Sequence, residues 1–266
     1  MLSNRGSRGP HPDSTPGTFH EALLTVLHRH TEDPDMTVLT RKLEPDTIAH
    51  VAGLLYLVII VSGIFAEVGV RGSLLIAGDA SATASNILES EWLYRLGFVA
   101  DAIMLLSDVG VAVLLYVLLK PVSKLLSLTA AAFRLTQAAV LSVNLLMYYS
   151  ANLLLTGEAY RAAFDSEKLD SLALLFLDIH SHGYDLGLLF FGISSLIVGT
   201  LVSRSSNLPT PLGYGLMASG IVYLTGSLTR FIAPQYLSML EPAYIVPLVA
   251  ELAFCLWLLF KGLMRE

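Results

Sequence analysis

The chain has 266 residues, of which 54% are hydrophobic and only 14% are charged, and its formal net charge is -6. Soluble domains carry roughly 25% charged residues, so this composition excludes an ordinary soluble protein and indicates a membrane protein. The modest acidic charge gives no reason to expect nucleic-acid binding. With a single cysteine, Cys255, the sequence allows no intrachain disulfide and no thiolate zinc site.

Residues 1–46 differ in composition from the rest of the chain. They are rich in Gly, Pro, Ser, His and charged residues and contain no long apolar run, which is typical of a disordered segment. We therefore expect a disordered, cytoplasmic N-terminal tail over residues 1–46 and one membrane domain over residues 47–266. Met36 lies shortly before the first apolar run, which raises the hypothesis that translation starts there.

Six apolar stretches follow along the rest of the chain, each of the roughly 20 residues or more that a helix needs to cross a bilayer. Apolar runs of this length lack the alternation of a membrane barrel, so helices are expected. The fold class predicted is all-α, a polytopic membrane protein with six transmembrane helices in one bundle. The predicted spans are Thr47–Gly69, Tyr94–Leu119, Lys124–Leu155, Leu172–Val202, Leu212–Phe231 and Ala243–Gly262.

The loops between these spans differ in charge. Lys and Arg favour the cytoplasmic side of a membrane protein, and one set of alternate connections is basic, whereas the other set contains many Asp and Glu residues. We therefore predict that both termini are cytoplasmic and that the two longest loops, about 70–93 and 156–171, lie outside. The basic set is Arg41, Lys42, Lys120, Lys124, Arg204, Lys261 and Arg265.

Several of the apolar stretches carry a family resemblance, among them AGLLYLVIIVSGIFAE, AAFRLTQAAVLSVNLL and LALLFLDIHSHGYDLGLLFFG. Together with LLSDVGVAVLLYVLLKPV and AELAFCLWLLFKG, they make the chain resemble a bacterial family of multi-pass membrane proteins, domain-of-unknown-function family 4386. The resemblance covers about residues 47–264. It implies a single six-helix domain in the bacterial inner membrane and implies no activity.

Ionisable side chains inside the spans are the candidate functional residues, because they are costly in a bilayer. Helical spacing places Asp101 with Asp108 on one face, and Arg134 with Gln137 and Asn144 on another. Asp178, His182 and Asp185 share a third face. We expect these faces to be buried against one another, with Arg134 as the cation for one carboxylate. The candidate binding or ion-relay residues are Asp108, Asp185, Glu251, Asp101, Asp178, His182, His180, Arg134 and Asn144.

The polar residues gather in the predicted outer half of the spans. This asymmetry raises the hypothesis of a polar cavity that opens to the outside and is closed near Asp108, Asp185 and Glu251. The alternative is that the polar faces only fix helix packing. Close helix contacts are also predicted at two pairs of small residues, Gly183 with Gly187 and Gly215 with Ser219.

The sequence leaves the activity and any oligomeric partner open. Buried carboxylates near a histidine favour proton- or cation-coupled transport of a small molecule. Binding of a lipid or small molecule, or an accessory role for another membrane protein, is a second alternative. A third is metal-dependent hydrolysis within the membrane, for which His180 and His182 are weak ligand candidates. They lie about 200° apart on a regular helix, so we expect neither a metal site nor a cofactor.

Overall fold

The computed structural model describes residues 44–263, and most of the predicted tail, residues 1–46, lies outside this range. The described part is helical and contains no strand, which confirms the all-α prediction. Its elements are α2 (Pro45–Ile64), η1 (a π-helix, Phe65–Arg71), α3 (Gly72–Leu74), α4 (Ala80–Glu89), α5 (Glu91–Leu119), α6 (Lys124–Thr156), α7 (Glu158–Ala163), α8 (Ser166–Arg204), α9 (Thr210–Ile232), η2 (Pro234–Tyr236), α10 (Leu237–Leu240), η3 (Glu241–Tyr244) and α11 (Ile245–Phe260).

Five of the described helical stretches are long and apolar enough to cross a membrane, which indicates a membrane protein. The sixth predicted span, Leu212–Phe231, does form a helix, α9, but α9 is not among these five. Its sequence is rich in Gly, Ser and Thr, which lowers its hydropathy. Six spans therefore stay a prediction. The five stretches are Pro45–Leu74, Glu91–Leu119, Lys124–Thr156, Ser166–Arg204 and Pro234–Phe260.

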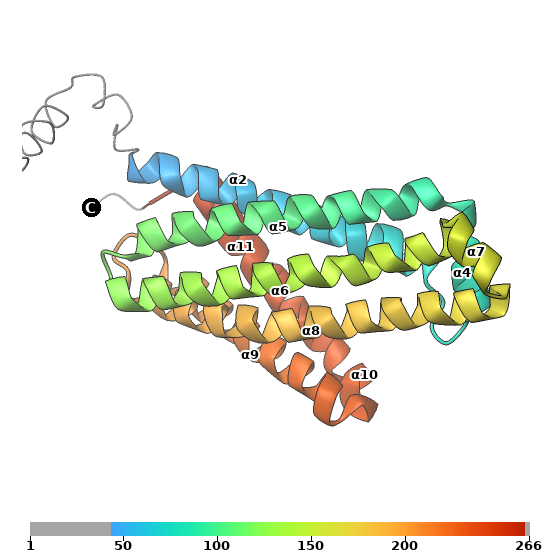
Figure 1. Ribbon diagram of the computed structural model, residues 1–266. Helices are drawn as coiled ribbons and strands as arrows, with labels where there is room; N and C mark the ends of the chain where they lie inside the picture. Colours follow the sequence, from blue (N-terminus) through green and yellow to red (C-terminus); the bar gives the residue numbers. More distant parts are fainter. Residues whose placement is uncertain (1–43, 264–266) are drawn as a thin grey trace, which may run out of the picture. The chain divides into compact units, whose positions relative to one another are not determined.

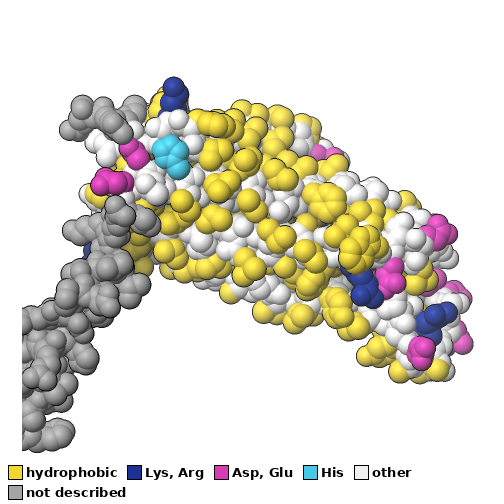
Figure 2. Space-filling view, turned by 90° about the horizontal axis from the view of Figure 1, so that it is seen from above, with side chains coloured by type: hydrophobic (Ala, Val, Ile, Leu, Met, Phe, Trp, Pro, Cys, Tyr) yellow, Lys and Arg dark blue, Asp and Glu magenta, His cyan; other side chains and the backbone are white. Residues whose placement is uncertain are grey.

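Successive long helices run in opposite directions and pack as neighbours (Figure 1). α5 contacts α2 and α6, α8 contacts α6 and α9, and α11 closes the arrangement between α9 and α2. The two ends of the described region meet, because the backbone N–H of Leu263 donates to Asp46 Oδ1 at 3.1 Å. On the face seen in Figure 2, hydrophobic side chains cover the middle and charged side chains gather toward the two ends, as expected for helices that cross a bilayer.

The predicted outer loops are partly helical. α8 has 39 residues, hence a length of about 58 Å, which exceeds the roughly 30 Å hydrocarbon core. The N-terminal end of α8 therefore projects beyond the hydrocarbon core. α4 and α7 lie beside this projecting end (Figure 1). Asp79 begins α4 by accepting a hydrogen bond from the backbone N–H of Ala82 at 2.9 Å, which satisfies a donor that the first turn leaves free.

Glycines allow a close contact between α8 and α9. A Cβ atom on Gly199 would lie 2.5 Å from the carbonyl oxygen of Gly213, and one on Gly220 would lie 2.7 Å from that of Gly192. Gly192 and Gly199 are seven residues apart on α8, and Gly213 and Gly220 are seven residues apart on α9. The two contacts therefore lie along one face of each helix. The predicted contacts at Gly187 and Gly215 are confirmed, since a Cβ on these residues would meet α6 and α11 respectively.

The buried apolar residues form two clusters, one toward each end of the helices. On α5 the first cluster includes Val111 and Leu115, and the second includes Met104 and Leu105. Asp108 lies between them on the same helix. The same order is found on α6 and α8, where polar residues lie between the residues of the first cluster and those of the second. A polar layer therefore crosses the bundle near its middle.

Candidate functional site

The centre of the polar layer is an ion pair between α5 and α6. Arg134 Nε donates to Asp108 Oδ1 at 2.8 Å, and both residues are only 3% exposed. In the amide orientation that satisfies its hydrogen bonds, Gln137 donates to Asp108 Oδ2 at 2.7 Å. The prediction that Arg134 is the cation for one buried carboxylate is confirmed.

Aromatic rings enclose the same guanidinium group. The Arg134 guanidinium carbon lies 5.1 Å from the ring centre of Tyr56 and 4.9 Å from that of Phe191. Such distances are those of cation–π contacts, which are strongest where water is excluded. This part of the bundle is therefore built to hold a positive charge.

Glu251 on α11 lies close to this pair, but it has a different environment. Its carboxylate accepts hydrogen bonds from the hydroxyl groups of Tyr223, at 2.7 Å, and Tyr56, at 3.2 Å. Within residues 44–263, no Lys, Arg or His nitrogen lies within 4.0 Å of its carboxylate oxygens. Glu251 is thus a midspan carboxylate that neutral hydroxyl groups hold in place.

A second buried arginine lies in η1. Arg71 Nη1 donates to Asp101 Oδ2 on α5 at 2.6 Å, and Arg71 Nε donates to Glu67 Oε2 at 2.7 Å. The π-helical turn changes the face on which the following side chains lie, and this brings Arg71 into the bundle. The sequence analysis missed this role, because it treated residue 71 as part of an outer loop.

A third ion pair joins α8 and α9. Arg230 Nε lies 2.9 Å from Asp185 Oδ2, and the hydroxyl of Ser227 donates to Asp185 Oδ1 at 3.4 Å. Arg230 also donates to the hydroxyl oxygen of Ser181. Both charged side chains are half-buried, so this pair is more accessible than that of Arg134 with Asp108.

His180 and Asn144 form the polar contact between α8 and α6. The Asn144 amide donates to the carbonyl oxygen of His180 at 2.8 Å, and its Nδ2 lies 3.2 Å from His180 Nδ1. Gly183 makes room for this amide, since a Cβ atom there would overlap the amide oxygen of Asn144.

The predicted burial of the face that Asp178, His182 and Asp185 share is wrong for two of its members. Asp178 and His182 are exposed, whereas His180 is buried. The reason is that α8 packs on α6 through His180 and Gly187, which turns residues 178 and 182 away from α6. The histidines therefore do not face one ligand, and no group of three His, Cys, Asp or Glu side chains in residues 44–263 could hold a metal ion.

Two cavities lie among these residues. The first, here called the carboxylate cavity, has a volume of about 410 Å³ and is lined by Glu67, Asp108, Glu251 and a largely apolar and aromatic wall. The second, the arginine cavity, has a volume of about 570 Å³ and is lined by Arg71, Arg230, Asp185 and His180. The two adjoin, because Glu67, Tyr184, Leu188 and Tyr244 line both.

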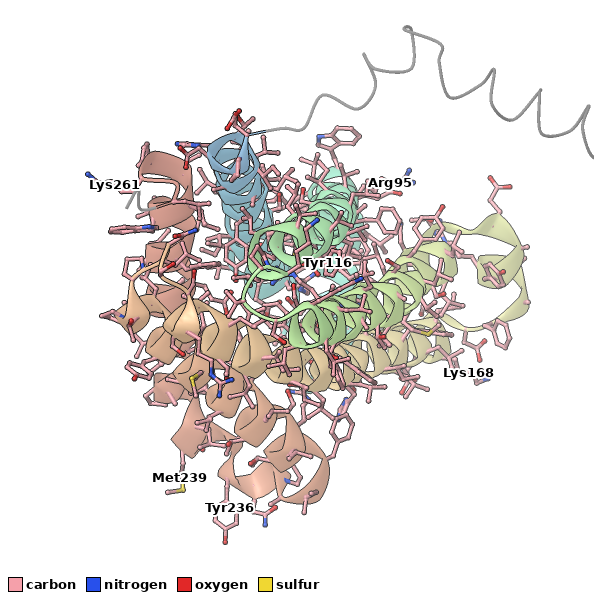
Figure 3. All side chains as sticks on the ribbon, turned by 90° about the vertical axis from the view of Figure 1, so that its left-hand side faces the viewer. Arg95, Tyr116, Lys168, Tyr236, Met239 and Lys261 are labelled. Atoms are coloured by element: carbon pink, nitrogen blue, oxygen red, sulfur yellow. The ribbon has the colours of Figure 1, made fainter. Side chains whose placement is uncertain are left out.

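The charges around the cavities do not balance. The charged residues that line them, with their ion-pair partners, comprise six carboxylates and three guanidinium groups, a formal charge of -3. The carboxylates are Glu67, Asp101, Asp108, Asp185, Glu241 and Glu251, and the cations are Arg71, Arg134 and Arg230. By contrast, Arg95, Lys168 and Lys261 point away from the helices (Figure 3).

The structure also brings in residues that the sequence analysis did not select. Four tyrosines, Tyr56, Tyr184, Tyr223 and Tyr244, line the carboxylate cavity or bond to Glu251. Tyrosine is common in membrane helices as an interfacial residue, so its type alone carries no signal. The usable signal is position, since a tyrosine near the middle of a span needs a buried hydrogen-bond partner.

The chain matches known proteins as follows. The sequence profile of the family described as Domain of unknown function (DUF4386) matches residues 51–262. An uncharacterized protein of the archaeon Archaeoglobus fulgidus is 28% identical over 165 residues, which cover 60% of this chain and 80% of the relative. No solved structure matches. Because this relative is archaeal, the expected bacterial origin stays a prediction.

Proposed function

The chain belongs to the DUF4386 family, and we propose that it is a six-span membrane protein that binds a small molecule or lipid in the carboxylate and arginine cavities. The observation that carries the proposal is the pair of adjoining cavities, of about 410 and 570 Å³. Small-molecule sites are usually cavities of about 300–1,000 Å³ with mostly apolar walls and a few placed polar groups. The carboxylate cavity has this composition.

Chain direction supports the sixth span. α8 and α11 run in the same direction through the bundle, and α9 connects them in the opposite direction (Figure 1). If both neighbours cross the bilayer, α9 must cross back between them. Packing against α8 and α11 reduces the lipid contact of its Gly, Ser and Thr residues, so a lower hydropathy is tolerated.

We also propose that the protein lies in a bacterial inner membrane with both termini on the cytoplasmic side. The basic loops at residues 120–124 and 204 support this orientation. The meeting of residues 46 and 263 supports a common side for both ends. Insertion of a reporter enzyme after residue 78 and after residue 206 tests it, since only the reporter after residue 78 is then expected outside.

The binding proposal is tested with a pair of variants on α8. Leu188→Trp fills the junction of the two cavities, whereas Leu186→Trp adds the same side chain on the exposed side of the helix. Native mass spectrometry of the protein released from lipid nanodiscs should show a retained small molecule or lipid in the wild type and in Leu186→Trp, but not in Leu188→Trp. A bare wild-type protein, or equal retention in both variants, would contradict the proposal.

Coupled transport is the second candidate, and Glu251 is the observation that favours it. A carboxylate in the membrane interior that forms no ion pair is a typical part of a proton or cation pathway, and Glu251 forms none within residues 44–263. Asp108 is less suited to that role than the sequence analysis proposed, because Arg134 and Gln137 already hold it. Proton flux into liposomes that contain the protein should be lost in Glu251→Gln, and flux equal to the wild type would exclude this role.

A further inference from the structure

We propose that the carboxylate cavity takes an organic cation with an apolar group, such as an alkylammonium compound, whose charged head lies between Glu251 and the rings of Tyr223 and Tyr244. The inference rests on the proposed binding function and names its ligand class. It follows from four features of the cavity: a carboxylate that forms no ion pair within residues 44–263, aromatic rings beside it, an excess of negative charge, and an apolar wall.

The first feature is Glu251 itself. The other two carboxylates of the carboxylate cavity are each paired with an arginine, Asp108 with Arg134 and Glu67 with Arg71. Within residues 44–263, Glu251 forms no ion pair within 4.0 Å and instead accepts hydrogen bonds from the hydroxyl groups of Tyr56 and Tyr223. A buried carboxylate is costly unless it is paired with a positive charge. Arg134 is nearby but is already paired with Asp108, so a cationic ligand would supply Glu251 with an ion-pair partner.

The second feature is the aromatic wall. Tyr223 packs edge-on against Phe191 at 5.2 Å and against Tyr244 at 6.1 Å between ring centres, and all three line the cavity. Clusters of aromatic rings are a usual recognition site for quaternary ammonium groups. Hydrated divalent cations instead take six or more oxygen ligands, which rings cannot provide.

Arg134 shows that this environment accepts a cation. Its guanidinium lies against Phe191 at 4.9 Å, but Asp108 already neutralises it. The formal charge of -3 around the two cavities remains after all three arginines are counted. A positively charged ligand reduces this excess, whereas an anionic ligand would increase it.

The last feature is the apolar wall, which indicates the rest of the ligand. Ile59, Ile60, Met104, Leu105 and Leu248 also line the cavity. They have no hydrogen-bonding groups in their side chains, so they fit a hydrocarbon chain better than a sugar or a peptide. The ligand class is therefore an amphiphilic cation.

The experiment compares three probes that share a six-carbon chain: hexyltrimethylammonium, hexanoate and hexan-1-ol. The protein is held in nanodiscs, and unfolding is followed through the reaction of the buried Cys255 thiol, the chain's single cysteine, with a fluorogenic maleimide on heating. At a hundred times its Kd, hexyltrimethylammonium should raise the midpoint by roughly 5 to 11 °C. The other two probes should leave it unchanged.

Variants identify the site. Glu251→Gln keeps the shape of the side chain and should weaken hexyltrimethylammonium binding at least tenfold, while Glu89→Gln, on the exposed side of α4, should bind like the wild type. Tyr223→Leu should lose most of the shift, and Tyr223→Phe, which keeps the ring, should retain it. Unfolding of each variant without probe shows whether it is folded at the start of the titration.

Each alternative outcome has a separate meaning. If hexanoate or hexan-1-ol stabilises the wild type as much as the cation, and Leu188→Trp abolishes the effect, the binding function stands and the ligand class is wrong. If the cation stabilises Glu251→Gln as much as the wild type, the assignment of Glu251 is wrong. If no probe stabilises the wild type, the ligand class is also wrong, and retained molecules in native mass spectrometry then decide the binding function independently.

Discussion

Removal of one partner from the ion pair of Asp108 and Arg134 should be among the most damaging single changes in the bundle. Both residues are 3% exposed, and Arg134 Nε bonds to Asp108 Oδ1 at 2.8 Å. Asp108→Leu would leave a buried guanidinium without its ion-pair partner, at a cost of about 3–5 kcal/mol. For a domain of this size, that corresponds to a fall of roughly 6 to 20 °C in the melting temperature.

The matched variant is Asp108→Leu combined with Arg134→Met. Replacement of both members of a buried ion pair by apolar residues of similar size is often close to neutral, so the double variant should recover most of the lost stability. Cys255 again supplies the assay, because its thiol is fully buried in the folded protein and reacts on unfolding. Melting temperatures are compared in the same detergent and at the same protein concentration.

Two results would refute this reasoning. A single variant as stable as the wild type would mean that the guanidinium finds water or another acceptor, so that the pair is not desolvated. A double variant as unstable as the single one would mean that the loss comes from packing around residue 108 rather than from the unpaired charge.

Two further substitutions test close contacts, with the same melting assay. Gly213→Ala should destabilise the fold by the 1–3 kcal/mol typical of overpacking, which lowers the melting temperature by roughly 2 to 12 °C, because its Cβ would lie 2.5 Å from a backbone nitrogen of α8. Gly63→Ala, whose Cβ would meet only a flexible methionine sulfur at 3.3 Å, is the control and should be neutral or slightly stabilising. Gly183→Ala should cost about 1–3 kcal/mol, since it displaces the Asn144 amide from His180; a value near zero would show that this hydrogen bond contributes little.

The helices themselves could be predicted from the sequence. Apolar runs of bilayer length leave only helices as a way to satisfy the backbone in lipid, and the observed α5, α6 and α8 contain the predicted spans. Spacing along one helix also predicted that Asp101 and Asp108 share a face. These are local properties, since each depends on residues within one helix.

The partner of each polar residue could be predicted only in part. Arg134 was a clear candidate, because it is an arginine within a span and carboxylates lie at similar depth. The choice between Asp108 and the other carboxylates depends on how α5 and α6 are rotated against each other. The sequence of either helix alone does not determine this rotation.

Tertiary packing decided the rest. α8 carries two histidines on opposite faces, and its contact with α6 buries His180 and exposes His182. The π-helical η1 turns Arg71 from an expected loop residue into a partner of Asp101. The carboxylate cavity arises where α2, α5, α8 and α11 meet, and the arginine cavity arises where η1, α8 and η3 meet. A sequence determines which faces a helix has, but the rotation and spacing of neighbouring helices determine which face is buried, because burial depends on contacts between residues far apart in the chain.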